Sequence, residues 1–354
     1  MQISQKSSSS WTGYAGLCLG IVLIVYLFSQ VDLHAAIGRI SKIGVSSVLI
    51  LVPYLALHLI ETFTWMKLFP RSITAIPFFK LLKIQIITET VSMTLPAGVA
   101  VGEPLRPFLC YRFLKIPLPA GVASVAIRKL MLGVAQGLYT LIGAIAGFSL
   151  LQKASLQMLG FEGLGYIMAA TGCAVFLSFL LLLMLLLNGK AAHNLHGFLM
   201  RIPFKRIKTW LTAKESGFYD TDQELKSYKG PFTGRLFMVL LFYILAWFTL
   251  AIESYIILTL LGVPISFVQV LAIDTSITIL RGLFFFIPSG LGVQDLGYLA
   301  FFQALGLQDF LAYGAAFVLL RRFKEVLWYA AGYGVMFFSG VHLHDAEGGV
   351  NGDS

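Results

Sequence analysis

The sequence predicts an all-α membrane protein, a polytopic bundle of about eight helices. This prediction rests on the composition and on long apolar runs that recur along the chain. Hydrophobic residues make up 58% of the 354 residues and charged residues 12%. Soluble domains carry about 45–50% apolar and about 25% charged residues. Apolar runs of about 20 residues, long enough to cross a bilayer, recur along the chain. A soluble enzyme or a catalytic ectodomain is excluded, because no polar stretch is long enough to fold one.

Eight hydrophobic segments are the candidate spans: 11–29, 45–69, 76–95, 120–150, 164–188, 235–262, 267–288 and 309–341. The first follows a short polar stretch, as in a signal sequence, but no small-residue cleavage site follows it. We therefore expect an uncleaved first span. We expect one integral membrane domain over 1–341 and a disordered acidic tail over 342–354.

The distribution of charge predicts an orientation in the membrane. The net charge is +9, and the segment 189–234 contains much of the excess. Basic loops between apolar spans usually face the cytoplasm, so 189–234 is expected to be a basic cytoplasmic loop in a multi-pass protein of a bacterial inner membrane. The near-neutral loop 151–163 then lies outside. The same orientation places four further basic residues in the cytoplasm: Arg39, Lys42, Arg112 and Lys115.

An internal repeat is the most informative feature of the sequence. Residues 95–103 (LPAGVAVGE) align with residues 287–295 (IPSGLGVQD). Arg128 and Arg321 follow the two aligned prolines by 32 and 33 residues, and Glu89 and Arg281 precede them by seven. Three landmarks in register predict a duplication, with repeat 1 over about 76–150 and repeat 2 over about 267–341.

Each repeat interrupts its own apolar run with proline and glycine. Pro96, Gly98, Pro288 and Gly290 are the expected structural hinges, because proline ends a helix and glycine permits unusual turns. Broken backbone at membrane depth persists only where protein or a water-filled cavity covers it. Paired interruptions of this kind point to the binding site of a transporter. We expect two re-entrant hairpins that converge near the middle of the bundle and line a central cavity, in which the repeated Arg, Glu and Asp side chains bind a headgroup. Ordinary loops at the membrane surface are the alternative, and the span count decides whether the repeats are parallel or inverted.

Fourteen charged residues fall inside apolar surroundings: Glu61, Glu89, Glu103, Arg106, Arg128, Lys129, Glu253, Asp274, Arg281, Asp295, Arg321, Arg322, Lys324 and Glu325. A charge at mid-bilayer costs at least about 2.5–3.5 kcal/mol, so such residues usually face a partner or a polar cavity. Helical spacing allows Glu103 to pair with Arg106, and Arg322 with Glu325.

Four of these charges, one acid and one base from each repeat, are expected to form one coupled polar site: Glu103, Arg128, Asp295 and Arg321. Guanidinium groups bind phosphate in a bidentate fork, which suits a lipid headgroup. A proton or ion pathway would use the same acids. Glu61 and Glu253 are taken to lie outside the repeat and are expected to be structurally paired.

The residues around the two breaks resemble a known family. TLPAGVAVGEPLRPFLCYR followed by ASVAIRK, and RGLFFFIPSGLGVQDLGY followed by FVLLRRFKE, are similar to the flippase-like transmembrane domain of bacterial lysylphosphatidylglycerol synthases. The chain resembles the standalone members, which lack the synthase domain, and its second block resembles a branch associated with hopanoid biosynthesis. The second half has Gln294-Asp295 where many relatives have Glu.

The resemblance implies a protein that moves a lipid, or the lipid-linked product of a partner enzyme, between leaflets. It implies neither an enzyme nor a cofactor, and no nucleic acid partner. Its family pattern assigns substrate binding to six positions: Glu103, Arg106, Arg128, Arg281, Asp295 and Arg321.

Two other functions remain open. A membrane-bound transferase would use the DxD pattern of Asp220 and Asp222 with a metal ion, but no nucleotide-binding fold fits that loop, and we expect it to be solvated. A non-transporting scaffold for lipid-synthesis enzymes would leave the repeated charges paired with each other. Neither the histidine pairs nor the cysteines predict a metal site: His193 and His196, His342 and His344, Cys18, Cys110 and Cys173. The histidines are expected at the surface.

Overall fold

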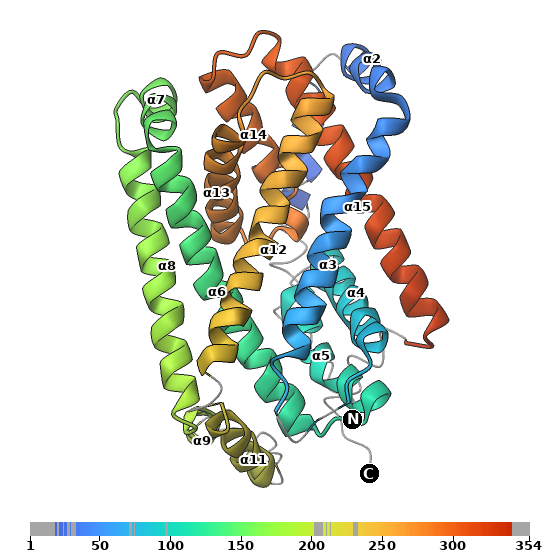
Figure 1. Cartoon of the computed structure of the whole chain (residues 1–354), viewed down its shortest axis with the longest axis vertical. Helices are drawn as coiled ribbons and strands as arrows, with labels where there is room; N and C mark the ends of the chain where they lie inside the picture. The colour runs from blue at the N-terminus through green and yellow to red at the C-terminus, as the bar shows by residue number, and fades with distance from the viewer. Residues whose placement is uncertain are drawn as a thin grey trace, which may run out of the picture.

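The computed structural model describes residues 33–341 except 71, 72, 74, 96, 97, 202–207, 210, 213 and 229–232, together with a few positions between 18 and 29. All regular structure in these residues is helical. Most of the expected first span 11–29, the hinge Pro96 and the expected tail 342–354 lie outside the described residues. The helices form an elongated bundle (Figure 1).

Seven of the eight expected segments coincide with helices, which are α3 (Val52–Met66), α4 (Phe78–Thr94), α6 (Leu118–Ala146), α8 (Leu164–Leu187), α12 (Thr233–Leu260), α13 (Phe267–Leu283) and α15 (Phe310–Phe338). Four stretches of the described chain are long and apolar enough to cross a membrane: His34–Met66, Leu118–Ala146, Leu164–Leu187 and Gly234–Leu260. The other three helices, α4, α13 and α15, are too short or too charged to be among these four stretches. α4 and α13 have 17 residues each, and α15 contains a run of charges over 321–325.

The shorter elements lie near the ends of the bundle or at the breaks of the long runs. They are α2 (Leu33–Ile43), η1 (Gly44–Leu51), α5 (Gly98–Leu114), α7 (Phe148–Leu159), α9 (Ala191–Leu199), α11 (Glu215–Lys226), η2 (Pro288–Gly290) and α14 (Val293–Ala304). α9 and α11 lie within 189–234, so the described part of the expected loop is largely helical. They lie at one end of the bundle, and α2 and α7 lie at the other (Figure 1).

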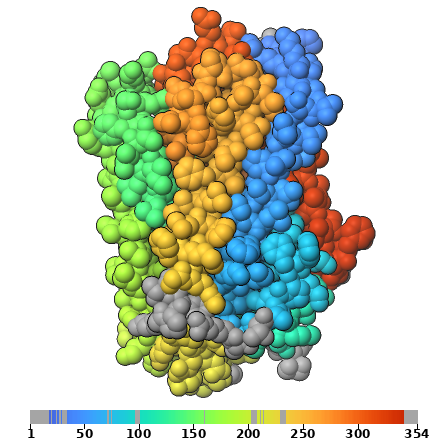
Figure 2. Space-filling model, in the orientation of Figure 1, coloured from blue at the N-terminus to red at the C-terminus, as the bar shows by residue number. Residues whose placement is uncertain are grey.

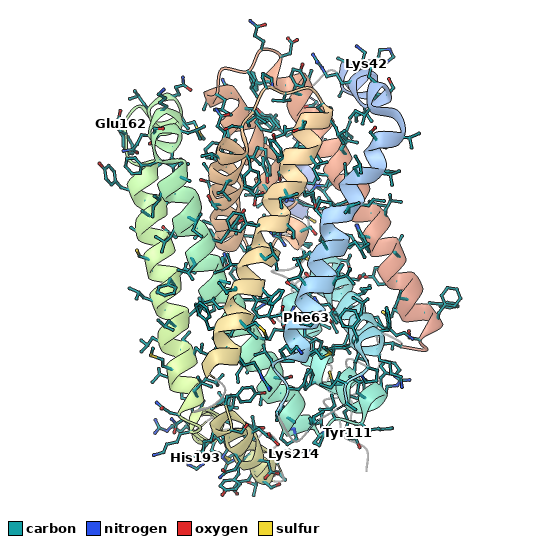
Figure 3. The ribbon with its side chains drawn as sticks, viewed as in Figure 1. Lys42, Phe63, Tyr111, Glu162, His193 and Lys214 are labelled. Carbon is teal, nitrogen blue, oxygen red and sulfur yellow. The ribbon has the colours of Figure 1, made fainter. Side chains whose placement is uncertain are left out.

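The hairpin of α4 and α5 corrects the expected orientation. Figure 3 shows Lys42 and Glu162 at one end of the bundle, with Tyr111, His193 and Lys214 at the other. The expectation that Arg39 and Lys42 share the side of 189–234 is therefore wrong. The segment 76–95 was counted as a full span, but α4 is paired with α5, which returns to the end where α4 began. Because α4 does not cross the bundle, every segment before α4 lies at the opposite end from the one expected.

The two broken segments form hairpins that open toward opposite ends. α4 and α5 pack against each other in the half that carries α11, and α13 and α14 pack together in the other half (Figure 1). The first hairpin opens where Ala75, before α4, and Lys115, after α5, line one pocket. The second opens at the α2 end, where Asp309 pairs with Arg39 at 3.2 Å. The two repeats are therefore inverted.

The tips of the hairpins meet inside the bundle. Ser289 Oγ donates to the carbonyl of Met93 at 3.4 Å, and Arg281 Nη2 lies 3.2 Å from Met93 Sδ. The backbone of the second tip is left-handed at Ser289 (φ 50) and Gly290 (φ 60), and Pro288 and Gly290 are buried. Ser289 of the second break therefore lies beside Met93, which precedes the first break, and the second break turns at its expected hinges. The convergence of Pro96–Glu103 with the second break stays a prediction, because Pro96 lies outside the described residues.

Each hairpin is held in its own apolar core. Leu81, Ile84 and Leu109 belong to a buried cluster around the first hairpin, and Ile273 and Phe302 belong to a second cluster around the other. The helices that precede the hairpins, α3 and α12, run side by side across one face (Figure 2). A 29-residue helix follows each hairpin, α6 after the first and α15 after the second. Charged side chains of the hairpins meet those of these long helices.

Candidate functional site

A group of charged residues from four helices, here called cluster 1, surrounds the first hairpin. Its members are Glu61 of α3, Gln85 and Glu89 of α4, Glu103 and Arg106 of α5, and Arg128 and Lys129 of α6. Arg106 and Arg128 are 1% and 2% exposed. Arg128 Nη2 lies 2.7 Å from Glu61 Oε2, and Arg106 lies 3.1 Å from Glu89 and 3.2 Å from Glu103. The buried cations of cluster 1 are therefore neutralised by protein carboxylates.

Two residues that the sequence did not single out organise cluster 1. Gln85 accepts from Arg106 Nη1 at 2.5 Å and donates to Glu61 at 2.5 Å, so it bridges the two buried guanidinium groups. The ring of Trp65 lies 5.6 Å from Arg106 and 5.8 Å from Arg128, within cation–π range. Neither residue interrupts its apolar segment with a charge, so hydropathy gave no signal for either.

The second hairpin is surrounded by a corresponding group, cluster 2. Its members are Glu253 of α12, Asp274 and Arg281 of α13, Asp295 and Tyr298 of α14, and Arg321, Arg322, Lys324 and Glu325 of α15. Arg322 contacts Asp295 at 2.6 Å and Glu325 at 2.5 Å. Lys324 Nζ contacts both carboxylate oxygens of Glu253, at 2.8 and 2.9 Å. Cluster 2 therefore also consists largely of internal pairs.

Asp274 is the centre of a hydroxyl network within cluster 2. Its carboxylate accepts from Tyr298 at 2.7 Å, from Tyr139 at 2.8 Å and from Ser254 at 3.2 Å. Arg321 Nη1 donates to the hydroxyl oxygen of Tyr298 at 2.7 Å, so Arg321 reaches Asp274 through a phenol. Because Tyr139 belongs to α6, this network joins cluster 2 to the long helix of the first repeat.

The pairing repeats between the clusters. Glu103 pairs with Lys129 at 3.0 Å, and the equivalent Asp295 pairs with Arg322 at 2.6 Å. The two predicted helical pairs, Glu103 with Arg106 and Arg322 with Glu325, are confirmed.

The interpretation that Glu61 and Glu253 lie outside the repeat was wrong. Each stands 35 residues before the proline of its break. Each also pairs with a cation of the long helix that follows its hairpin, Arg128 or Lys324. The register of the repeat therefore extends back into α3 and α12.

The expected single site of Glu103, Arg128, Asp295 and Arg321 is divided between the two clusters. Arg128 Nη1 lies 4.0 Å from Glu103 within cluster 1, and Asp295 pairs with Arg322 rather than Arg321. No ion pair among the described residues joins the clusters. The inversion explains this division, because each hairpin carries its charges in its own half of the bundle.

The DxD aspartates have separate surroundings. Asp220 is exposed, whereas Asp222 is 4% exposed and accepts from the backbone N–H groups of Ala192 and His193, both at 2.9 Å. The expectation of a solvated pair is wrong for Asp222, which caps the N-terminus of α9.

The histidines of this region also differ in their surroundings. His193 is exposed as expected, but His196 is buried, with Nε2 3.2 Å from the carbonyl of Leu211. His342 and His344 lie outside the described residues. Among the described residues, no group of three or more His, Cys, Asp or Glu side chains could hold a metal ion.

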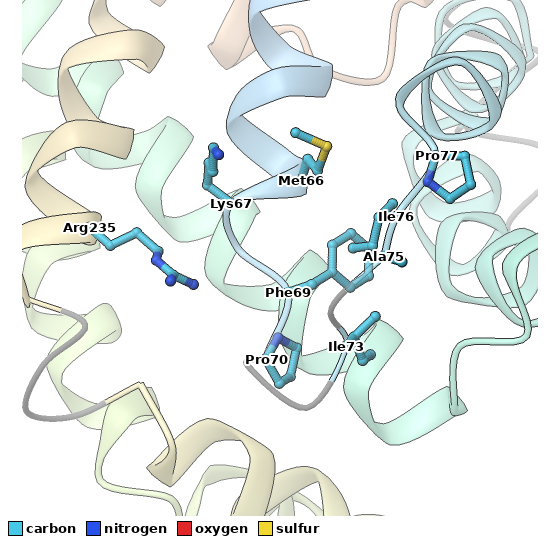
Figure 4. A pocket seen from close by; sticks show the side chains of 9 residues that line it. All are labelled: Met66, Lys67, Phe69, Pro70, Ile73, Ala75, Ile76, Pro77 and Arg235. Carbon is cyan, nitrogen blue, oxygen red and sulfur yellow. The ribbon is translucent and has the colours of Figure 1, made fainter.

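Two open pockets lie at the α11 end of the bundle. The larger, of about 620 Å³, lies between the end of α3, the start of α4 and the start of α12 (Figure 4). Its wall is apolar at Met66, Phe69 and Ile76, and Lys67 and Arg235 supply its cations. The smaller, of about 370 Å³, adjoins it at Ile73 and Ala75, residues that line both pockets. Neither pocket is lined by a residue of the hairpin tips.

A family model described as "Lysylphosphatidylglycerol synthase TM region" matches residues 13–331. This range contains both hairpins and every charged residue of the two clusters. No curated protein matches the chain.

Proposed function

Because the chain belongs to the family of the lysylphosphatidylglycerol synthase transmembrane region, we propose that it translocates a lipid or a lipid-linked molecule between membrane leaflets. In this proposal it is a multi-pass protein of a bacterial inner membrane, and its α4–α5 and α13–α14 hairpins are re-entrant instead of spanning, so it has fewer spans than the eight expected. It is not an enzyme, and its partners are its lipid and an enzyme of lipid biosynthesis, such as hopanoid biosynthesis.

The meeting of two inverted hairpin tips is the observation that carries the proposal. Transporters built from inverted repeats bind their substrate near the bilayer midplane, at the interface between broken helices. Here Ser289 of one tip lies 3.4 Å from the carbonyl of Met93 beside the other. A headgroup that passed between the tips would stay near polar side chains for the whole crossing, while its acyl chains stayed in lipid.

Internal neutralisation of the clusters fits this role. Moving a polar group past unpaired buried charges would trap it, whereas paired charges offer hydrogen bonds without strong net attraction. The pairs of Glu61 with Arg128 and Glu253 with Lys324 also fix the helices on either side of each hairpin. The proposal is therefore that the clusters hold the frame and that the tips move.

Reconstitution tests the proposal directly. The purified full chain is placed in liposomes with trace amounts of headgroup-labelled lipids, and a membrane-impermeant reagent measures how much label reaches the other leaflet. Transport of at least one lipid well above protein-free liposomes is expected. A folded protein that moves none of a panel of anionic, zwitterionic and isoprenoid lipids would refute translocation.

A non-transporting scaffold is the second candidate, and mutual pairing of the clusters favours it. A scaffold needs rigid buried charges and no path between leaflets, and the described pockets lie away from the tips. The same liposomes distinguish the two, since a scaffold leaves label distribution unchanged yet co-purifies with its enzyme. The transferase has less support, because backbone N–H groups occupy both oxygens of Asp222.

A further inference from the structure

The two hairpins carry different side chains at three pairs of equivalent positions, and the two members of each pair are 192 residues apart in the sequence. Glu89 corresponds to Arg281, Gly102 to Gln294, and Arg106 to Tyr298. In the first hairpin Glu89 and Arg106 pair at 3.1 Å. In the second, a base replaces the acid and a phenol replaces the base, so this ion pair does not exist there.

Arg281 is the arginine that this difference leaves without a direct ion pair among the described residues. It is half-buried beside the meeting tips, and its Nη2 donates to the weak acceptor Met93 Sδ, at 3.2 Å. No described carboxylate lies within 4.0 Å of its guanidinium group. Every other arginine of the two clusters contacts a carboxylate or, for Arg321, a phenol bonded to one.

Gln294 is a second unsatisfied group in the same hairpin. Its side chain is 1% exposed, and neither Nε2 nor Oε1 has a hydrogen-bond partner in the described part of the chain. A buried polar atom without a partner costs free energy, so native proteins rarely leave both ends of an amide unpaired. The equivalent Gly102 has no such space, because a Cβ there would overlap Ser92 Oγ. The first hairpin is closed at this position.

Gly290 places the two groups side by side. A Cβ on Gly290 would lie 3.2 Å from Arg281 Cγ and 3.5 Å from Gln294 Cδ, so both side chains flank the same bare backbone. Its φ of 60° also favours glycine. The Arg281 side chain and an amide with a free donor and a free acceptor thus flank the same glycine at the tip.

This combination has a definite ligand chemistry. The guanidinium group and the amide N–H suit an anionic phosphate oxygen. The amide oxygen needs a donor, which a hydroxyl or an amine beside the phosphate supplies and a trimethylammonium group does not. We propose that the second hairpin is the ligand-binding one, and that Arg281 and Gln294 bind a phosphodiester headgroup bearing a hydroxyl or amine donor. That this phosphodiester belongs to a lipid rests on the proposed function. That Arg281 and Gln294 suit a phosphodiester does not.

Binding measurements on the full chain in detergent test the site. Native mass spectrometry compares phosphatidylglycerol, phosphatidylethanolamine and phosphatidylcholine with identical acyl chains. The first two are expected to bind about tenfold more tightly than phosphatidylcholine, the value of one good hydrogen bond. Gln294→Leu is expected to remove this preference, and Arg281→Gln to weaken all three about tenfold or more. Arg281→Lys, which keeps the charge and loses the fork, is expected to lie between.

The control is Lys67→Gln, in the pocket of Figure 4, which removes a cation of similar exposure far from the tips. It should leave the lipid preference unchanged. Gln294→Leu should fold at least as well as the parent, because it removes an unpaired amide. A preference that persists in Gln294→Leu, or an equal loss in Lys67→Gln, would overturn the proposal.

Soluble probes distinguish the source of the phosphate. Binding of glycerol 3-phosphate as tightly as phosphatidylglycerol, and its loss in Arg281→Gln, would support the site and assign it to a free phosphoester. Much weaker binding of glycerol 3-phosphate and of inorganic phosphate would support a lipid. Intact headgroup preference in a protein that moves no lipid in liposomes would refute the proposed function and leave this site standing.

Discussion

Removing one partner of the Glu253–Lys324 pair should destabilise the protein far more than removing both. Glu253 and Lys324 are 1% and 3% exposed, and both carboxylate oxygens contact the ammonium group. The ring of Tyr54 lies 4.4 Å from Lys324 Nζ, so the cation is enclosed by protein. Glu253→Gln leaves this charge buried without its acid, at a cost of about 3–5 kcal/mol in the free energy of unfolding. Denaturant titration in mixed micelles measures that cost.

The double variant Glu253→Gln, Lys324→Met should recover most of the loss, because it removes the uncompensated charge and keeps the volume filled. The matched control combines Glu253→Gln with Glu61→Gln in cluster 1. These two losses should add, since no ion pair among the described residues links the clusters and Glu61 and Glu253 share no ion-pair partner. Losses below about 1 kcal/mol in the single variant, or strong coupling between Glu61 and Glu253, would refute the division into two internally neutral clusters.

Three further outcomes follow. Asp222→Ala should lower the free energy of unfolding by about 1–2 kcal/mol, because it removes the cap of α9. Faster proteolysis of 189–234 measures this loss, and transport should stay unchanged; a loss of transport would support the transferase. Gly102→Ala should lower the thermal stability of the first hairpin through overlap with Ser92 and with the carbonyl of Thr88. Adding Ser92→Gly should restore only part of the loss, because the Thr88 carbonyl stays 2.8 Å from the new Cβ; an unperturbed single variant would contradict the close approach. Reporters fused near Ser216 and near Lys42 should report opposite sides of the membrane, and the same side for both would contradict the reversed hairpin.

Much of the fold was predictable because helices in lipid need long apolar runs, and seven of eight such runs became helices. What hydropathy could not distinguish was a full span from half of a hairpin. The segment 76–95 has the length of a full span, yet α4 stops at Thr94 and pairs with α5. That single difference changed the expected topology and left the inversion of the repeats to the structure.

The candidate site was predictable only where the chain itself sets the spacing. Glu103 with Arg106 follows from helical geometry, whereas Gln85 and Tyr139 reach their partners across the bundle and have no local signature. The recurrence of Glu61 at Glu253 was available in the spacing to each proline, but it lay beyond the assumed start of the repeats. Partners of buried charges depend on tertiary packing, which one sequence does not reveal.

In the proposed function, lipid crosses the membrane where the two inverted hairpin tips meet. Met93→Cys with Ser289→Cys, in a background where Cys18, Cys110 and Cys173 are Ala, allows the tips to be joined by a short thiol cross-linker in liposomes. Joining the tips is expected to stop transport of headgroup-labelled lipid, and reduction of a cleavable linker is expected to restore transport. Each single cysteine variant is expected to transport normally. Full transport through a protein shown to be cross-linked would contradict the claim.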